Sequence, residues 1–147
     1  MRVIPEPGGD LIRASWIGTL IFVTAAIIAT IDPDALGWPG IIVSLTLFTM
    51  GAVAMLMAFF VAVERSRTQT IAVGGLYFGA GSTPRVIRGH LLGAAGIQLA
   101  VGITTASIRP FTVVAFGTLA PVFGLGLMGL WTARHGQFPE REPDPKR

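Results

Sequence analysis

Four long apolar segments without a charged side chain alternate with short polar or proline-containing segments along the chain. The apolar segments cover residues 14–31, 41–63, 91–108 and 111–131, and none contains Asp, Glu, Lys or Arg. A helix needs about 20 largely apolar residues to cross the roughly 30 Å hydrocarbon core of a bilayer. The pattern therefore predicts an all-α membrane protein with four transmembrane helices.

The segments between the apolar runs carry residues that start and end helices. Segments 32–34, 39–40 and 109–110 each contain proline, which at a helix start lacks only a donor that would be unpaired there. We interpret residues 1–137 as a single integral membrane domain. The charged, proline-containing residues 138–147 are predicted to form a disordered tail, because such a composition buries too little apolar surface to offset the entropy of folding.

The uncharged stretch at residues 68–84, within a predicted cytoplasmic loop at 64–90, leaves the number of spans open. Its apolar part is too short to cross a bilayer. Each glycine in it would also cost a helix about 1 kcal/mol, and the glycines are Gly74, Gly75, Gly79 and Gly81. We expect an interfacial or re-entrant segment, whereas a fifth span would move the C-terminus to the opposite side of the membrane.

Composition supports the membrane class. Hydrophobic residues make up 52% of the chain and charged residues 13%, with a mean hydropathy of +0.67. Soluble domains average about 45–50% apolar residues, glycine included, and about 25% charged residues. The absence of cysteine excludes a disulfide framework, a thiolate metal site and a nucleophilic thiol. The basic residues lie at the ends of apolar runs rather than along one element, so we expect no nucleic-acid partner.

The distribution of Lys and Arg predicts the orientation. Of the 11 Lys and Arg residues, only Arg109 lies in the two loops that would share one side of the membrane. The others flank the opposite ends of the runs: Arg2, Arg13, Arg65, Arg67, Arg85, Arg88, Arg134, Arg141, Lys146 and Arg147. Because cytoplasmic loops retain basic residues, we expect both termini to lie in the cytoplasm. The expected location of the protein is the plasma membrane of the cell. The first run is longer than a usual signal-peptide core, so we expect it to remain as a span.

The third apolar run carries small residues along one side of the predicted helix. We call this set the small face: Gly89, Gly93, Gly96, Ala100, Thr104 and Ser107. Spacings of three and four residues keep its members together on a helix, and small residues allow helix backbones to approach closely in lipid. We expect the small face to pack inside the bundle of this chain, with Gly89, Gly93, Gly96 and Ala100 as candidate contact residues.

Gln98 and Thr105 lie on the opposite side of the same helix. A glutamine amide facing lipid would leave donors and acceptors unpaired, which is energetically expensive. Since one helix does not easily bury two opposite sides, we take these residues as a candidate partner face for another subunit. The alternative is that Gln98 bonds to a threonine or to a backbone carbonyl group inside the bundle.

Pro121, near the middle of the fourth run, predicts a kink, because proline removes a backbone hydrogen bond and frees the carbonyl group of Gly117. Gly124, Gly126 and Gly129 follow it. These three glycines are compatible either with a hinge in the helix or with tight packing against a neighbouring helix.

A short internal similarity links the ends of the first and third runs. Residues 29–33 read ATIDP and residues 106–110 read ASIRP. If the two helix pairs are parallel repeats, Asp32 and Arg109 lie at the same level of the membrane. They are therefore a candidate ion pair.

Few residues offer catalytic or cofactor chemistry. The apolar runs contain none of the charged side chains that a proton- or cation-coupled carrier normally keeps in the membrane. His90 and His135 lie at predicted helix ends, away from the depth a haem ligand would need. No carboxylate and histidine share a depth at which they would activate a hydroxyl group. We expect no enzyme activity, no catalytic residue, no cofactor and no metal site.

Several motifs in the second half of the chain point to one group of proteins. They are GHLLG at 89–93, ASIRPF at 106–111, GLGLMGLW at 124–131 and ARHG at 133–136. With the surrounding residues 71–141, they resemble small uncharacterised multi-pass membrane proteins of actinobacteria. The resemblance implies no activity and no functional residue.

Together these features predict an accessory or scaffolding subunit of a membrane complex that acts through its helix faces. Its expected partners are the lipid bilayer and either further copies of itself or another membrane protein. The alternative is a small transporter or channel component for a neutral solute. A polar cavity lined by Gln98, Thr104 and Thr105 would favour transport, and a smooth external groove would favour a protein partner.

Overall fold

The computed structural model describes residues 7–143, and over that range it consists of helices and the loops that join them. The helices are α1 (Gly9–Ile31), α2 (Pro33–Arg65), α3 (Val73–Tyr77), α4 (Arg85–Ile108), the 3-10 helix η1 (Val113–Leu119) and α5 (Pro121–His135). Four stretches are long and apolar enough to cross a membrane: α1, α2, α4 and the combined η1 and α5. The predicted all-α fold with four candidate spans is confirmed.

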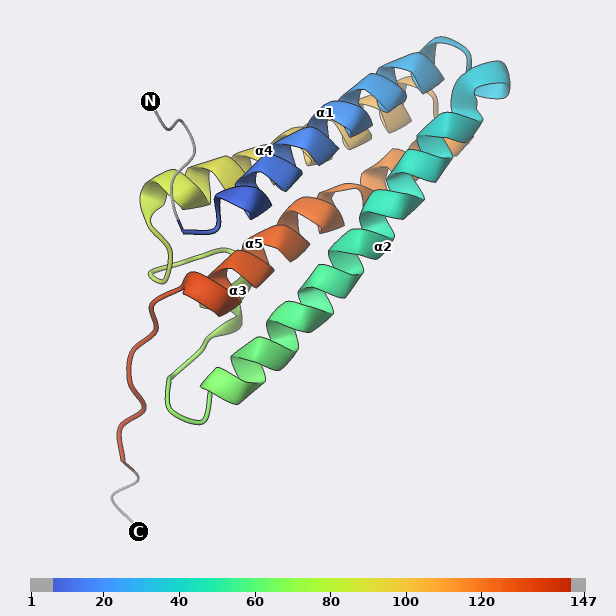
Figure 1. Ribbon diagram of the computed structural model, residues 1–147. Coiled ribbons are helices and arrows are strands. Elements are labelled where there is room, and N and C mark those ends of the chain that lie inside the picture. The colour runs from blue at the N-terminus through green and yellow to red at the C-terminus, as the bar shows by residue number, and fades with distance from the viewer. Residues whose placement is uncertain (1–6, 144–147) are drawn as a thin grey trace.

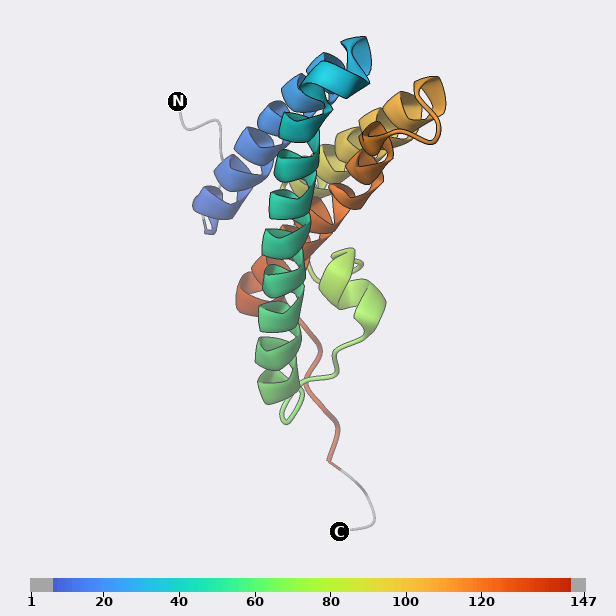
Figure 2. The ribbon, with the colours of Figure 1, turned by 90° about the vertical axis from the view of Figure 1, so that its right-hand side faces the viewer.

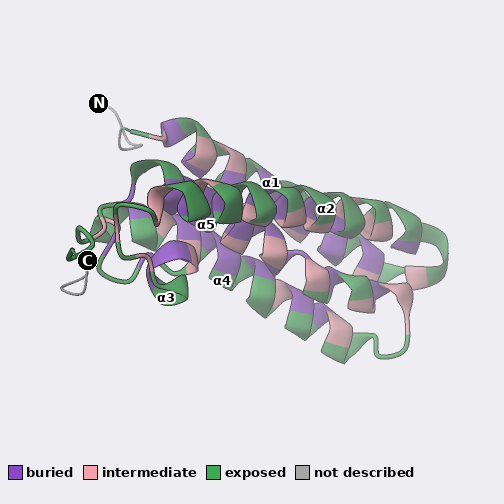
Figure 3. Cartoon of the chain, turned by 90° about the horizontal axis from the view of Figure 1, so that it is seen from below, coloured by how far each residue is buried: buried purple, intermediate pink, exposed green. Residues whose placement is uncertain are grey.

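The four long helices form an elongated bundle in which consecutive spans run in opposite directions and α5 is the central element (Figure 1). α1 and α4 lie side by side, α2 runs along α5, and α5 contacts α1, α2, α3 and α4. Of the 15 residues of α5, 11 are buried, and Figure 3 shows this buried helix within the bundle. The fourth predicted span therefore forms the core around which the others pack.

The first three spans, α1, α2 and α4, begin earlier than the apolar runs suggested. α2 starts at Pro33, and the carboxylate of Asp32 accepts a hydrogen bond from the Ala35 amide at 3.1 Å, as a helix N-cap does. Pro39 then lies inside α2, although segment 39–40 was expected to open the second helix. The Asp32 cap and Pro33 in the first turn start the helix, so the apolar pattern marks only the part that lipid surrounds.

The outward surface of the bundle is apolar, as contact with lipid requires. Ile17, Leu20, Trp38 and Phe60 are each more than half exposed, whereas soluble monomers rarely expose contiguous apolar surface of this extent. The buried core combines a few large side chains with small ones; among them, Phe22, Met128 and Trp131 are almost fully buried. These observations are those of a multi-pass membrane protein.

Residues 66–84 form no fifth span. The segment contains only the five-residue helix α3, which lies beside α5 (Figure 2). The Tyr77 hydroxyl group donates to the Met55 carbonyl oxygen of α2 at 3.1 Å, and burial raises the pKa of this hydroxyl group above its ordinary value. Met55 lies eight residues before Val63, the end of the second apolar run, or about 12 Å along the helix. The segment therefore contacts α2 within this run, and the interfacial and re-entrant interpretations both stay open.

The beginning of the predicted disordered tail is ordered against the loop that follows α2. Gln69 and Glu140 form an antiparallel bridge, supported by hydrogen bonds from the Thr70 amide to Pro139 O at 2.8 Å and from the Arg141 amide to Thr68 O at 2.9 Å. Backbone pairing between distant segments is invisible to a composition argument, which explains the difference for residues 138–143. Residues 144–147 lie outside the described residues.

Arg65 joins the end of α2 to the end of α5. Its Nη1 and Nη2 atoms donate to the carbonyl oxygens of Ala133 and Gly136 at 2.7 and 2.8 Å, and its Nε atom donates to Gln69 Oε1 at 3.0 Å. The guanidinium group also lies over the Phe138 ring, 5.2 Å from the centroid. Since the last carbonyl groups of a helix lack partners within it, Arg65 stabilises both the end of α5 and the path of the tail.

Replacing Arg65 is therefore expected to loosen the tail while the bundle remains. Arg65→Gln should lower the free energy of unfolding by about 1.5–3 kcal/mol, the usual contribution of hydrogen bonds from a charged group. Limited proteolysis should cut residues 136–143 faster than in the parent protein. Arg67→Gln, a change at an exposed arginine nearby, is the control, and equal cleavage in both variants would contradict this role.

Candidate functional site

Helix α4 turns the side with Gln98 and Thr105 toward the inside of the bundle. Gln98 is fully buried and Thr105 is 6% exposed. The Gln98 Nε2 atom donates to Thr19 Oγ1 of α1 at 2.7 Å, and Thr19 Oγ1 donates to Ser15 O at 2.8 Å. The Gln98 Oε1 atom accepts a hydrogen bond from the Gly124 amide of α5 at 3.3 Å. One buried amide thus connects three helices.

A break in the fourth span explains why Gly124 needs this partner. The chain changes from the 3-10 helix η1 to α5 at Ala120–Pro121. The Phe123 amide bonds to Ala120 O at 2.9 Å, but the other amides of a first helical turn lack partners within the helix. In hydrocarbon such a group is costly. Gln98 supplies the acceptor that the Gly124 amide would otherwise lack.

This arrangement corrects two expectations. Gln98 and Thr105 are not a partner face for another subunit; the alternative, bonding inside the bundle, is what the structure shows. Pro121 produces a break between two helices rather than a kink, and the Gly117 carbonyl oxygen is not free, because it accepts from the Ala120 amide at 3.2 Å. The 3-10 geometry of η1 lets that bond form one residue earlier than in an α-helix.

The small face lies on the outside of the bundle, opposite to the expectation. A Cβ atom added at Gly89, Gly93 or Gly96 would meet no atom of another element within 4 Å in the part of the chain that the structure describes, and the other members, Ala100, Thr104 and Ser107, are exposed. Helical spacing shows that these residues share a side but not which way that side points. The need to bury Gln98 turns α4 the other way.

Other glycines of the spanning helices show the contrast. At Gly18, Gly51, Gly102, Gly124 and Gly126, an added Cβ atom would come closer than 3.0 Å to a neighbouring element. For Gly124 and Gly126 this favours tight packing over a hinge. These glycines allow close helix contacts, whereas the three on the small face carry the helix cost of glycine without a neighbouring element close to them among residues 7–143.

An apolar groove of about 480 Å³ lies on the outside between α1 and α4. Its walls include Ile27, Thr30 and Ile31 of α1, and Ala100, Thr104 and Ile108 of α4. Thr105 also borders it, but Gln98 does not. The groove is thus external and continuous with the end of the small face that carries Ala100 and Thr104.

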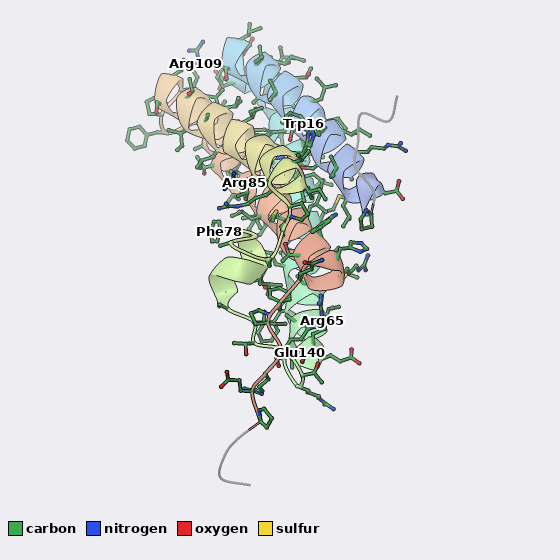
Figure 4. The ribbon with its side chains drawn as sticks, turned by 90° about the vertical axis from the view of Figure 1, so that its left-hand side faces the viewer. Trp16, Arg65, Phe78, Arg85, Arg109 and Glu140 are labelled. Atoms are coloured by element: carbon green, nitrogen blue, oxygen red, sulfur yellow. The ribbon has the colours of Figure 1, made fainter. Side chains whose placement is uncertain are left out.

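Arg109 lies at the end of the bundle where α1 and α4 finish (Figure 4), and it binds two residues that line the groove. Its Nε atom donates to Thr30 O at 2.9 Å and its Nη2 atom to Ile31 O at 3.3 Å. Asp32 follows Ile31 directly, so the two charged residues share one end of the bundle as predicted. The predicted ion pair between them is not formed: Arg109 binds the unpaired carbonyl groups at the end of α1, and Asp32 caps α2.

Both histidines lie at the other end of the bundle and pack against tryptophan. Trp16 Nε1 donates to His90 Nδ1 at 3.4 Å, and the rings of Trp131 and His135 are 5.4 Å apart. Sequence reasoning missed Thr19 and Arg65 as contact residues. Ser15 and Thr19, four residues apart within an apolar run, were the signal for the inner polar side of α1.

No protein-family model matches the chain, and neither a curated protein nor a solved structure is significantly similar to it. The resemblance to actinobacterial membrane proteins therefore stays a prediction.

Proposed function

We propose that this protein is an accessory or scaffolding subunit of a membrane complex and binds a transmembrane helix of its partner on the small face of α4. The observation that carries the proposal is the open space beside Gly89, Gly93 and Gly96. Each glycine destabilises a helix by about 1 kcal/mol relative to alanine. A partner helix that approaches closely across these positions would offset this cost, since association in lipid depends on such contacts.

The shape of the outer surface supports a protein partner over solute transport. The neutral-solute alternative needs a polar path that includes Gln98, but this side chain is fully buried and both ends of its amide are hydrogen-bonded. Broken membrane helices often form substrate sites in transporters. Here the start of α5 after Pro121 packs against Gln98 and Ala95 of α4. The break therefore supports helix packing and does not form a substrate site.

The proposed setting is the plasma membrane, with both termini in the cytoplasm. The support is the distribution of basic residues: Arg109 follows the end of α4, whereas Arg65 ends α2 and Arg85 starts α4 at the opposite end of the bundle. A reporter fused after Arg147 should be active on the cytoplasmic side. An extracytoplasmic signal would contradict this orientation.

Gly93→Leu is expected to abolish the association without changing the stability of the monomer, because its side chain would fill the space that the partner helix needs. The measurement is tagged purification in gentle detergent, with mass spectrometry of the proteins retained and thermal unfolding of each variant. Thr46→Leu, which enlarges an exposed small residue on α2, is the matched control. If Gly93→Leu and Thr46→Leu retain the same proteins, the small face is not the binding surface.

Self-association is a separate outcome that the absence of cysteine makes easy to detect. Gly93→Cys would place the sole thiol of the chain at the centre of the small face. Oxidation in native membranes should give a disulfide-linked dimer only if two copies pair through α4. A cross-linked dimer would identify the partner as a second copy rather than another protein.

A further inference from the structure

The groove between α1 and α4 is large enough for an extended hydrocarbon chain. Its volume of about 480 Å³ lies within the roughly 300–1,000 Å³ of small-molecule sites in proteins. Its walls are almost entirely apolar, with Ile27 and Ile31 on one side and Ala100 and Ile108 on the other. Because it opens to the outside of the bundle, it faces the acyl chains of the surrounding lipids.

Arg109 is held next to the groove, at the C-terminal end of α4. Two of its guanidinium nitrogens bind carbonyl oxygens of Thr30 and Ile31, and these two residues also line the groove. Its Nη1 atom makes no hydrogen bond with residues 7–143, so it can donate to a phosphate group, a partner that guanidinium groups recognise well. Trp38, 69% exposed at the same end, fits the depth of lipid headgroups, where indole rings gather.

Carboxylates accompany Arg109 at this end. Asp32 and Asp34 are both exposed, and Asp32 follows the residue whose carbonyl oxygen Arg109 binds. This end therefore offers one cation for a phosphate group and carboxylates for a second, positive group nearby. A headgroup with phosphate alone would meet net repulsion from two carboxylates, whereas a zwitterionic headgroup would pair with both charges.

We propose that the groove binds one phospholipid with a phosphoethanolamine headgroup: an acyl chain lies between α1 and α4, the phosphate binds Arg109, and the ammonium group binds the carboxylates of Asp32 and Asp34. The primary ammonium group matters because it donates hydrogen bonds, which a quaternary choline group does not. The site shares Ala100 and Thr104 with the small face, whereas Gly89, Gly93 and Gly96, which carry the proposed partner contact, lie outside the groove.

Native mass spectrometry of the full chain in detergent tests this site. The probes are dioleoyl phosphatidylethanolamine, phosphatidylcholine and phosphatidylglycerol, which share acyl chains and differ in headgroup. The parent protein should retain one phosphatidylethanolamine at least about tenfold better than either other lipid, a difference of about 1.4 kcal/mol. Equal retention of the three lipids would overturn the headgroup assignment.

Two variants of adjacent residues test the groove itself. Ala100→Phe fills the groove from an exposed wall position, and Leu99→Phe, at a position 48% exposed and outside the groove, is its control. We expect Ala100→Phe to lose about tenfold in lipid retention and Leu99→Phe to match the parent, with unchanged thermal unfolding in both. Equal retention by the two variants would overturn the acyl-chain site.

Two further variants separate the headgroup contacts and the partner surface. Asp34→Asn should reduce the preference for phosphatidylethanolamine over phosphatidylglycerol, while Arg109→Gln should weaken retention of both. An unchanged preference in Asp34→Asn and unchanged retention in Arg109→Gln would overturn the assigned contacts. Gly93→Leu should keep the lipid even when it loses the partner protein, so the two proposals can fail separately.

Discussion

Gly126→Leu is expected to destabilise the bundle by about 3 kcal/mol or more, because overpacking at a backbone contact leaves no side chain able to move away. Gly126 lies against Gly51 of α2, where an added Cβ atom would meet the Gly51 carbonyl oxygen. The approach is equally close from the side of α2, since a Cβ atom at Gly51 would lie 2.5 Å from the backbone N and Cα atoms of Phe123 in α5. α2 and α5 thus touch backbone to backbone.

Thermal unfolding in detergent, followed by circular dichroism, measures this effect. Gly126→Leu should unfold far below the parent protein or fail to accumulate in the membrane. The control is the same substitution at Gly96, on the small face, which should leave the unfolding temperature unchanged or raise it slightly, because leucine favours helix more than glycine does. A comparable loss of stability in Gly96→Leu would mean that the small face packs inside the bundle after all.

Gln98→Leu is expected to destabilise the protein by about 2 kcal/mol, because a buried donor that loses its acceptor keeps its full desolvation penalty. The group left unpaired is the Gly124 amide at the start of α5. In this variant the Thr19 hydroxyl group still donates to Ser15 O. Thr19→Val should cost a similar amount, because it leaves the buried Nε2 group of Gln98 without its acceptor. In a double-mutant cycle the two changes should be non-additive, since Gln98 and Thr19 share one hydrogen bond.

Hydrogen exchange adds a local measurement to this prediction. The Gly124 amide should exchange faster in Gln98→Leu, while amides in the middle of α2 keep their protection. Thr105→Val is the matched control, because this buried hydroxyl group bonds only to carbonyl groups of its own helix. If both variants lose equal stability and Gly124 exchange is unchanged, Gln98 does not support the break in the fourth span.

The sequence by itself determined how many helices could cross a membrane. A long apolar run without charged residues indicates that lipid surrounds the segment, and this conclusion does not depend on which helices lie next to it. The runs also placed Asp32 and Arg109 at one end of the bundle, because each terminates an apolar run. For the same reason, the short apolar part of residues 68–84 already argued against a fifth span.

Only the tertiary structure decided which side of each helix faces inward. Helical periodicity grouped the small face correctly and set it opposite Gln98, but periodicity is a property of one helix and contains no direction toward a partner. The direction came from the 3-10 segment before Pro121, which leaves an amide in the core that Gln98 satisfies. The order of residues 138–143 and the groove between α1 and α4 likewise depend on contacts between segments far apart in the chain, which no local pattern records.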